Sequence, residues 1–503
     1  MAHFQAKTSP GKSIVAGVHA GLLLVATLSC GSGANLGGGS PNNPPPLLRR
    51  LSTDTFLNDT SQHATEVEPS IAAFGSTLVS VFQLGRFFDG GASDIGFATS
   101  IDNGVSWQTG VLSGITVFAG GTYNAVSDPS VAYDRAHATW LIASLATLNS
   151  DMVLVSRSQD GLNWSGPVTV STTPDADKDW ITCDNSQTSP HYGHCYVEWD
   201  DPSTNGLFWI STSTDGGQTW SRAANTGNLA TGLGGVPVVQ PNGTVVVPAS
   251  DDAGGQMIAF ISTDGGSTWS SSTIISPISD HFVAGNLRND ALPMSALDAA
   301  GVVYVVWPDC RFRTACTSND IVLSTSSDGM TWTSPVRIPI DAVSSTADHF
   351  LPAIAVDPST AGSSAHLTLV YHEYSDAACA ELTCALSVAY VTSQDGGTNW
   401  SAPSQLAGPM SLDWLANTKL GRMVGDYVGA AYSSSNAFPA IAVARPNNLT
   451  VFDEATYSTT NPLIQARAVA AVERTQPRPG ARSDHPPRRY YDLEHRYPRK
   501  PVL

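Results

Sequence analysis

Basic side chains are scarce over most of this 503-residue chain. Residues 51 to 466 contain 12 lysines and arginines against 39 aspartates and glutamates, a difference of −27 charges. Nucleic-acid binding needs a basic surface that neutralises phosphates, so this balance excludes it for the body of the chain. The acidic side chains favour solubility and could hold incidental Ca²⁺, but beyond that we expect no metal and no cofactor.

Long apolar runs are also lacking after residue 28, which excludes a membrane-spanning helix later in the chain. The run from 14 to 28 follows Lys7 and Lys12 and predicts a secretory signal over residues 1–30. It ends in Leu28-Ser29-Cys30, which resembles a bacterial lipobox with Cys30 as the lipidated residue; cleavage without lipidation is the alternative. We therefore expect an exported protein at the cell envelope, held at the outer surface only by a lipid anchor, or otherwise secreted. Residues 31–50 should be a flexible linker.

Cysteine is rare, with seven residues in total. Apart from Cys30 they form three pairs that are close in sequence: Cys183 with Cys195, Cys310 with Cys316, and Cys379 with Cys384. In an exported chain, such pairs predict three loop-closing disulfides. His191 and His194 lie inside the first pair, so a zinc site is the alternative there, but disulfides are favoured.

In contrast to these absences, one motif occurs six times. Its fullest copy is Ser213-Thr214-Asp215-Gly216-Gly217-Gln218-Thr219-Trp220, and its aspartates are Asp102, Asp160, Asp215, Asp264, Asp328 and Asp395. The Asp side chain can accept hydrogen bonds from the N–H groups that follow it, and Gly supplies a positive φ. The Trp then covers the turn with an apolar ring. Short apolar runs precede several copies, so the motif predicts a turn between two antiparallel strands, repeated along the chain.

The motif resembles the Asp box, or BNR repeat, of sialidases and other β-propellers. The resemblance covers most of residues 60–460 and implies an all-β fold, a β-propeller of four-stranded antiparallel blades. Six boxes and a box-free end predict seven blades over residues 51–460, with residues 51–58 closing the ring. Six blades, the number in sialidases, is the alternative. Residues 461–503 are rich in Arg and Pro and predict a disordered basic tail.

The arginines of the body are unevenly placed on this predicted propeller. In a meander of four strands the boxes lie at one face, so the starts of the first strands gather at the other face. Six of the ten arginines between residues 51 and 466 are predicted at that box-free face: Arg86, Arg288, Arg311, Arg313, Arg422 and Arg445. Because guanidinium binds carboxylate with a planar fork, this predicts a site for an anionic group. The alternative for any single arginine is an ion pair with Asp89, Asp290, Asp309 or Asp426.

The resemblance to sialidases implies roles for residues at matching topological positions. It implies that Arg86, Arg288 and Arg311 bind a sugar carboxylate. Tyr427 would be the nucleophile, with Glu68 or Glu373 as its base, and Asp128 would donate the proton. The Phe/Tyr-Arg-Ile-Pro motif of the family is absent before the first box, so no role is carried over by motif.

We therefore predict a monomeric, surface-exposed exo-glycosidase of the sialidase type that acts on glycans or glycoconjugates with carboxylated sugars. The alternative is a non-catalytic propeller that binds glycan or protein at the cell surface, because the fold does not by itself imply chemistry.

Overall fold

The computed structural model describes residues 46–147, 151–172, 175–251, 255–447, 451–465 and 470–471. The predicted signal, Cys30 and most of the predicted linker lie outside these residues. The chain divides into two units, Met1–Gly38 and Gly39–Leu503, and every described residue belongs to the second. No helix among the described residues is long and apolar enough to cross a membrane.

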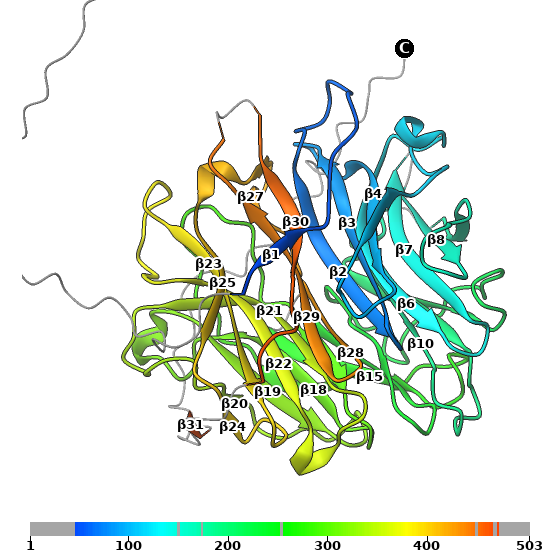
Figure 1. Ribbon diagram of the computed structural model, residues 1–503. Coiled ribbons are helices and arrows are strands. Elements are labelled where there is room, and N and C mark those ends of the chain that lie inside the picture. Colours follow the sequence, from blue (N-terminus) through cyan, green and yellow to red (C-terminus); the bar gives the residue numbers. More distant parts are fainter. Residues whose placement is uncertain are drawn as a thin grey trace, which may run out of the picture. The chain divides into compact units, whose positions relative to one another are not determined.

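The second unit is built almost entirely from antiparallel strands (Figure 1). The largest sheet joins two meanders: β2 (Glu66–Phe74), β3 (Thr77–Arg86), β4 (Ala92–Ser100) and β5 (Gln108–Val111), then β6 (Ala125–Asp134), β7 (Thr139–Thr147), β8 (Asp151–Ser158) and β9 (Val168–Ser171). A three-stranded sheet follows, made of β10 (Asp177–Cys183), β11 (Cys195–Asp201) and β12 (Leu207–Ser213).

Four separate four-stranded sheets complete the arrangement. The first two are β13 (Val238–Val239), β14 (Val245–Asp251), β15 (Gln256–Ser262) and β16 (Thr273–Pro277), and β17 (Met294–Leu297), β18 (Val303–Asp309), β19 (Asp320–Ser326) and β20 (Val336–Arg337). The next two are β21 (Asp348–Val356), β22 (Leu367–Tyr374), β23 (Ala385–Ser393) and β25 (Ser404–Ser411), and β28 (Gly429–Ser433), β29 (Asn436–Ala444), β30 (Glu454–Thr459) and β1 (Leu48–Arg50).

Short elements lie between and beside these sheets. Two-stranded pairs are formed by β24 (Asn399–Trp400) with β31 (Ala470–Ala471), and by β26 (Ala416–Thr418) with β27 (Gly421–Met423). The 3₁₀ helices are η1 (Val117–Ala119), η2 (Pro202–Thr204), η3 (Thr314–Cys316), η4 (Gly362–Ser364) and η5 (Leu412–Trp414).

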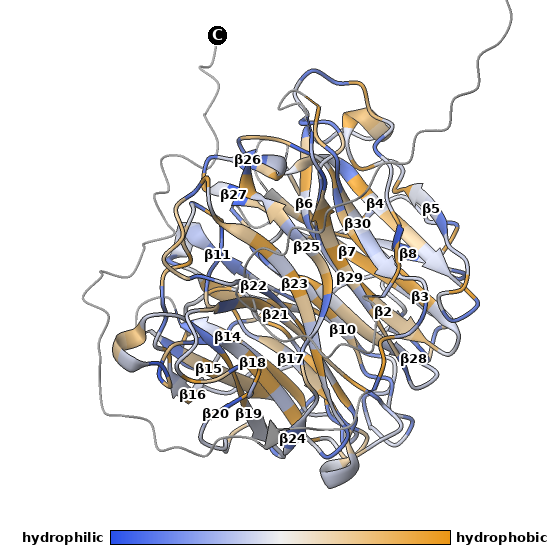
Figure 2. Cartoon of the chain, turned by 60° about the vertical axis from the view of Figure 1, so that its left-hand side comes forward, coloured by the Kyte–Doolittle hydropathy of each residue, from blue (hydrophilic) through white to orange (hydrophobic). Residues whose placement is uncertain are grey.

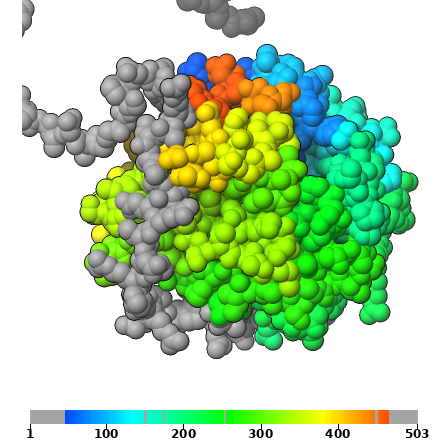
Figure 3. Space-filling view, turned by 90° about the horizontal axis from the view of Figure 1, so that it is seen from below, coloured from blue at the N-terminus to red at the C-terminus, as the bar shows by residue number. Residues whose placement is uncertain are grey.

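The first strands of successive meanders form a ring. β2 contacts β6, β6 contacts β10, and the series continues through β13, β17, β21 and β28 back to β2. This arrangement confirms the predicted all-β propeller. Figure 3 shows the N-terminal (blue) and C-terminal (orange-red) ends of the ring side by side at the surface, as expected because β1 pairs with β30.

The predicted blade count is wrong: within the described residues five sheets have four or more strands, not seven and not six. Two meanders are merged into one eight-stranded sheet by a bridge between Ala92 and Val126. The sheet β10–β12 stops at three strands because the segment after its box makes only isolated bridges, such as Ile210 with Ala224. Repeat spacing therefore found the meanders but could not show how their edges pair.

The closing strand is also not the one predicted. Residues 48–50, expected in the linker, form β1 and pair with β30, whereas residues 51–58 form no strand. Arg50 anchors β1 through an ion pair with Asp453, 2.7 Å between nitrogen and oxygen. At the other end, the described part of the predicted tail includes Leu463, which is buried and donates its N–H to Ala437. The ordered ring thus extends past both predicted boundaries.

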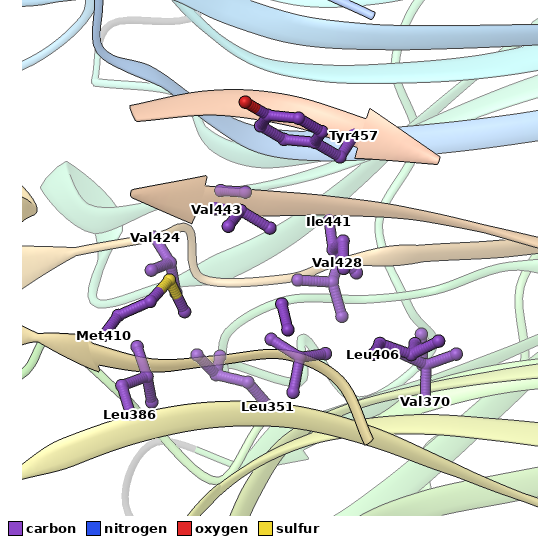
Figure 4. Close-up of a cluster of buried hydrophobic side chains, with 14 of the residues drawn as sticks. Leu351, Val370, Leu386, Leu406, Met410, Val424, Val428, Ile441, Val443 and Tyr457 are labelled. Atoms are coloured by element: carbon purple, nitrogen blue, oxygen red, sulfur yellow. The ribbon is translucent and has the colours of Figure 1, made fainter. Parts of the chain in front are cut away.

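Apolar side chains from neighbouring meanders fill the spaces between the sheets. Figure 2 shows the hydrophobic residues concentrated along the strands. In the largest cluster, Val370 and Leu386 from β22 and β23 face Ile441 and Val443 from β29 (Figure 4). The tryptophans Trp199, Trp307 and Trp400 are completely buried. Packing between sheets, rather than within one sheet, therefore holds the first strands at their positions.

The six boxes form the predicted turns. In each, the Ser hydroxyl donates to the Asp carboxylate, as Ser213 does to Asp215 at 2.9 Å. In three boxes the indole N–H donates to a carbonyl inside the turn, as Trp400 does to Gly397 at 3.0 Å; the indole nitrogens of Trp220, Trp269 and Trp332 have no hydrogen-bond partner in the described residues. The three predicted disulfides are confirmed as 183–195, 310–316 and 379–384. Such bonds are typical of chains that fold in an oxidising compartment.

Candidate functional site

Four of the first strands share an irregularity that interrupts the pairing with the next strand. In β2, β6, β10 and β21 the pairing register shifts, and the residues at the shift are Glu68, Asp128, Lys178 and Leu351. All four have a positive φ, between 46° and 53°, which side-chain-bearing residues rarely adopt. A bulge re-aims a side chain and is common next to functional sites. The repeated bulge therefore brings three charged side chains toward one another from three different strands.

These residues belong to a buried charged cluster, which we call the first-strand cluster: Glu68, Asp128, Lys178, Arg288 and Asp426. The ammonium of Lys178 contacts Asp426 and lies 3.3 Å from Asp128. Arg288 holds both oxygens of Asp426, through Nε at 2.7 Å to Oδ1 and through its second fork nitrogen to Oδ2. The backbone N–H of Asp426 donates to Glu68 at 3.3 Å. All five residues are less than a tenth exposed.

Burial and neighbouring charges shift the pKa values of two carboxyl groups of the cluster in opposite directions. Burial raises the pKa of Glu68 to about 8, with Asp128 and Asp426 adding to the rise. Burial also opposes ionisation of Asp426, but Arg288 and Lys178 hold the pKa of its carboxyl below the usual range. Glu68 is therefore protonated at neutral pH while its neighbour Asp426 is ionised. Opposite protonation states of adjacent carboxyls are typical of acid–base sites.

A pocket opens among the first strands beside this cluster. Lys178 and Trp180 from β10, and Asp426 and Tyr427 from the segment before β28, supply its polar and aromatic lining. The rest of the wall consists of Gly234, Gly235, Val236, Asp290, Leu292, Pro293, Met294, Leu351 and Pro352. An aromatic platform with a few convergent polar groups is the usual composition of a small-molecule site.

Tyr427 is the residue of the predicted site that faces this pocket. Its hydroxyl donates to the carbonyl of Pro129 at 3.1 Å, and its ring stands edge-on to Trp180, 5.1 Å between centroids. Burial raises the pKa of the Tyr427 phenol well above its ordinary value, and the charges of Glu68 and Asp128 add to this rise. The phenol is therefore neutral in the resting protein.

The three predicted carboxylate-binding arginines have different surroundings. Arg288 belongs to the first-strand cluster, whereas Arg86 donates to Gln83 at 3.1 Å and to the carbonyl of Gly91 at 2.8 Å. Gln83 in turn donates to Glu68, so Arg86 is one residue removed from the cluster. Arg311 forks onto Asp309, with nitrogen–oxygen distances of 2.8 and 2.6 Å, and also contacts Ser276 and Pro277. For Arg288 and Arg311 the alternative, an ion pair with a nearby aspartate, holds in the structure. Their predicted role toward a substrate stays a prediction.

Comparison with known proteins agrees with this architecture. Residues 151–351 match the family model of the BNR repeat-like domain. The chain is a BNR-repeat β-propeller. No curated protein sequence matches it.

The fold of this BNR-repeat propeller is similar to that of several solved structures. The Hadza microbial sialidase Hz136 is 15% identical over 79% of this chain and 66% of its own, with a TM-score of 0.40. Trypanosoma rangeli sialidase in a covalent complex with 2,3-difluorosialic acid is 11% identical over 82% of this chain and 57% of its own, with a TM-score of 0.42. An ulvan lyase of family PL25 is 10% identical over 82% and 96%, with a TM-score of 0.48. The chain thus spans less than two thirds of the length of the two sialidases.

Glu373, the second predicted base, lies in a different part of the BNR-repeat propeller. Its carboxylate is 3.6 Å from Nε2 of His349, beyond which lies Asp341. Burial raises the pKa of Glu373 to about 7, and Asp341 adds to it; burial lowers the pKa of His349 to about 4. None of these three residues is in the lining of the pocket beside Tyr427. The structure therefore groups Glu68, Asp128, Arg288 and Tyr427 and separates Glu373 from them.

Sequence reasoning missed two kinds of residue in this propeller. Lys178 has the same place in its strand as Glu68 and Asp128, but both of those precede a proline, and Lys178 precedes Asp179. A repeat alignment on the bulge, rather than on the Pro, would have found it. Asp179 and Glu198 are fully buried carboxyl groups whose oxygens have no hydrogen-bond partner within the described residues. Burial raises the pKa of both well above the usual range.

Proposed function

We propose that the chain is a sialidase-like glycosidase that acts on carboxylated sugars, such as those of sialoglycans, in the pocket beside the first-strand cluster. The observation that carries the proposal is the juxtaposition at this pocket of a neutral phenol, Tyr427, with the cation Lys178 and the carboxyl of Asp426, which Arg288 holds from outside the lining. A cation at the wall attracts a carboxylated sugar, and an uncharged nucleophile is not repelled by it.

The cluster supports distinct roles for its members. Tyr427 would attack the sugar, and the ionised form of Glu68 would accept the phenol proton. With a pKa of about 8 this form is a stronger base than an ordinary glutamate, but it is populated only as the pH approaches 8. Asp128 would donate the proton to the leaving group, the role that its topological position implies, and it must take up a proton first, because Lys178 at 3.3 Å favours its ionised form. Glu373 lies outside this cluster, which favours Glu68 as the base.

Binding of the substrate carboxylate would require an exchange of partners. Arg288 binds Asp426 with its two-pronged fork, and Lys178 contacts the same carboxylate. The substrate carboxylate must therefore share these two cations with Asp426 or displace Asp426 from them. Arg86 and Arg311 are the further arginines proposed from their topological positions. Loss of one charge-assisted contact to the substrate should cost about 1.5–3 kcal/mol, or about tenfold to a hundredfold in affinity or rate.

The test is turnover of a fluorogenic sialoside by the purified full chain. Tyr427→Phe should abolish turnover and leave binding of a carboxylated sugar largely intact. The matched control is Tyr374→Phe, which removes another buried phenol, one without a hydrogen-bond partner for its hydroxyl in the described residues. Unchanged turnover in Tyr427→Phe would contradict the assigned nucleophile.

The pH dependence tests the base separately. If Glu68 must be ionised, kcat/KM should rise with pH toward a plateau above about pH 8. Glu68→Gln should remove that rise together with most of the activity. Saturable binding of a carboxylated sugar with no turnover in the wild-type chain would instead establish the alternative, a non-catalytic glycan-binding propeller.

We also propose that the protein works outside the cytoplasm, anchored at the outer surface through Cys30. The three disulfides support an exported chain. Cys30→Ala should release the protein or block its maturation. Identical fractionation of wild type and variant into a soluble extracytoplasmic pool would contradict the anchor.

A further inference from the structure

His349 has one ring nitrogen that no hydrogen bond reaches among the described residues. The residue is 1% exposed at the start of β21. Its Nδ1 lies 3.3 Å from the backbone carbonyl of Asn319. A carbonyl oxygen can only accept, so Nδ1 carries the hydrogen and Nε2 presents a lone pair. That lone pair faces carboxylates: Nε2 is 3.6 Å from Glu373 and 3.9 Å from Oδ2 of Asp341.

Two arginines fix the aspartates that face this nitrogen. Arg313 and Arg337 both bind Oδ1 of Asp341, at 2.7 and 2.5 Å. The same two guanidinium groups bind Oδ1 of Asp320, at 2.6 and 2.8 Å. In each aspartate this leaves Oδ2 buried without a hydrogen-bond partner in the described part of the chain. An unpaired buried carboxylate oxygen is costly, and Oδ2 of Asp341 lies 3.9 Å from the imidazole lone pair.

We propose that Asp320, Asp341 and His349 form a binding site for a divalent transition-metal ion, with Zn²⁺ as the best match. Each offers one ligand atom, and the three atoms lie within 4.8 Å of one another. Tetrahedral Zn²⁺ with bonds of about 2.1 Å places its ligand atoms about 3.4 Å apart. To bind the ion, the ligand atoms must therefore move closer to one another, by a few tenths of an ångström up to about 1.4 Å. The surroundings are those of a metal site: the other nitrogen of the histidine donates to a carbonyl, and the ligand carboxylates are held from behind.

The donor set distinguishes between metals. Ca²⁺ takes six to eight oxygen ligands, which this group does not supply, whereas imidazole nitrogen suits Zn²⁺, Ni²⁺ and Cu²⁺. Arg313 and Arg337 balance the charges of Asp320 and Asp341, so the site lacks the strong negative charge on which Ca²⁺ depends. Glu373, whose side chain is 28% exposed, lies at the solvent side and is positioned to supply a fourth ligand on the path of entry.

The experiment is a titration of the full chain, freed of metal by dialysis against a chelator, with Zn²⁺ in a calorimeter and with Co²⁺ in a spectrophotometer. We expect one equivalent of Zn²⁺ per chain, and visible Co²⁺ bands typical of low coordination number. His349→Gln should abolish this binding. The matched control is His366→Gln, a half-buried histidine elsewhere in the same sheet region, which should bind as the wild type does.

A second variant keeps the test decisive if His349→Gln does not fold. Glu373→Gln lies at the solvent edge and should weaken Zn²⁺ binding about tenfold or more, while Glu381→Gln, an exposed glutamate, should have no effect. Absence of saturable binding in the wild type would overturn the proposal. So would equal affinity in Glu373→Gln and Glu381→Gln, or loss of binding on replacing His191 and His194 instead.

Discussion

The box turns and the first-strand cluster both depend on aspartates, yet the groups that stabilise the aspartate charge are close in sequence in a box and distant in sequence in the cluster. In a box, neighbours in sequence solvate the carboxylate: Asp102 accepts from the hydroxyl and the N–H of Ser106, and these bonds lower its pKa to about 2. In the cluster, the partners come from distant strands, and Asp426 depends on Lys178 and Arg288, 248 and 138 residues away in sequence.

This difference separates the box turns, which stabilise the fold locally, from the first-strand cluster, which brings together the groups able to carry chemistry. A box turn is self-sufficient within eight residues and lies at the surface, so it can be copied six times without a change in the rest of the chain. The cluster exists only when the ring of first strands closes, because each member lies on or before a different strand. Because its side chains are buried, water does little to stabilise their charges, and each charge is stabilised mainly by the opposite charges beside it.

The largest expected effect is loss of Asp426. Asp426→Ala leaves two buried cations, Lys178 and Arg288, without their shared partner, and should lower the free energy of unfolding by about 3–5 kcal/mol. Chemical denaturation of the full chain measures this. Asp59→Ala, at an exposed turn, is the control and should change stability by less than about 0.5 kcal/mol. A loss below about 1 kcal/mol at Asp426 would show that the cluster is solvated.

The next effect is a pH dependence that the buried carboxyls cause and the boxes do not. Burial raises the pKa of Glu66 to about 7, although the hydrogen bond that Ser52 donates to its carboxyl lowers it. A raised pKa means that the folded state binds the proton more tightly, so stability falls as pH rises from about 4.5 to about 7. Glu66→Gln should reduce this fall by about 2–3 kcal/mol.

Thermal unfolding at pH 5 and pH 8 checks this prediction. The box aspartates should contribute nothing in that window, because with a pKa of about 2 Asp102 and Asp328 lose their stabilising charge only as pH falls from 3.8 toward 2. Equal melting temperatures at the two pH values, in both wild type and Glu66→Gln, would contradict the raised pKa.

A box should be worth less than a buried ion pair. Asp215 accepts the hydroxyls of Ser213 and Thr219 and the N–H groups of Gln218 and Thr219. Asp215→Ala removes these bonds at a half-exposed turn and should cost about 1–2 kcal/mol. Asp264→Ala, in the next box, should cost the same in a parallel denaturation experiment. A cost as large as that of Asp426→Ala would erase the distinction between the two regions.

This distinction also explains what the sequence could predict. The boxes, the three disulfides and the all-β propeller follow from signals a few residues long. The cluster required knowing which strands meet: Lys178 gave no local signal, and Glu373 matched a topological role but faces His349. The blade count failed for the same reason, since the bridge between Ala92 and Val126 is a contact between edges that no repeat encodes.

The smallest expected effect is at an ion pair that belongs to neither region. Lys419 lies 2.7 Å from Asp89, but their side chains are 30% and 52% exposed. Water and salt screen such a pair, and ordering two flexible side chains offsets the attraction, so Asp89→Asn should cost between 0 and about 1 kcal/mol. A double-mutant cycle with Lys419→Met isolates the interaction, and the coupling should shrink further in 1 M salt. Coupling above about 2 kcal/mol that persists in salt would mean that charge pairing alone, without burial, can hold this fold, and the contrast between cluster and surface would then fail.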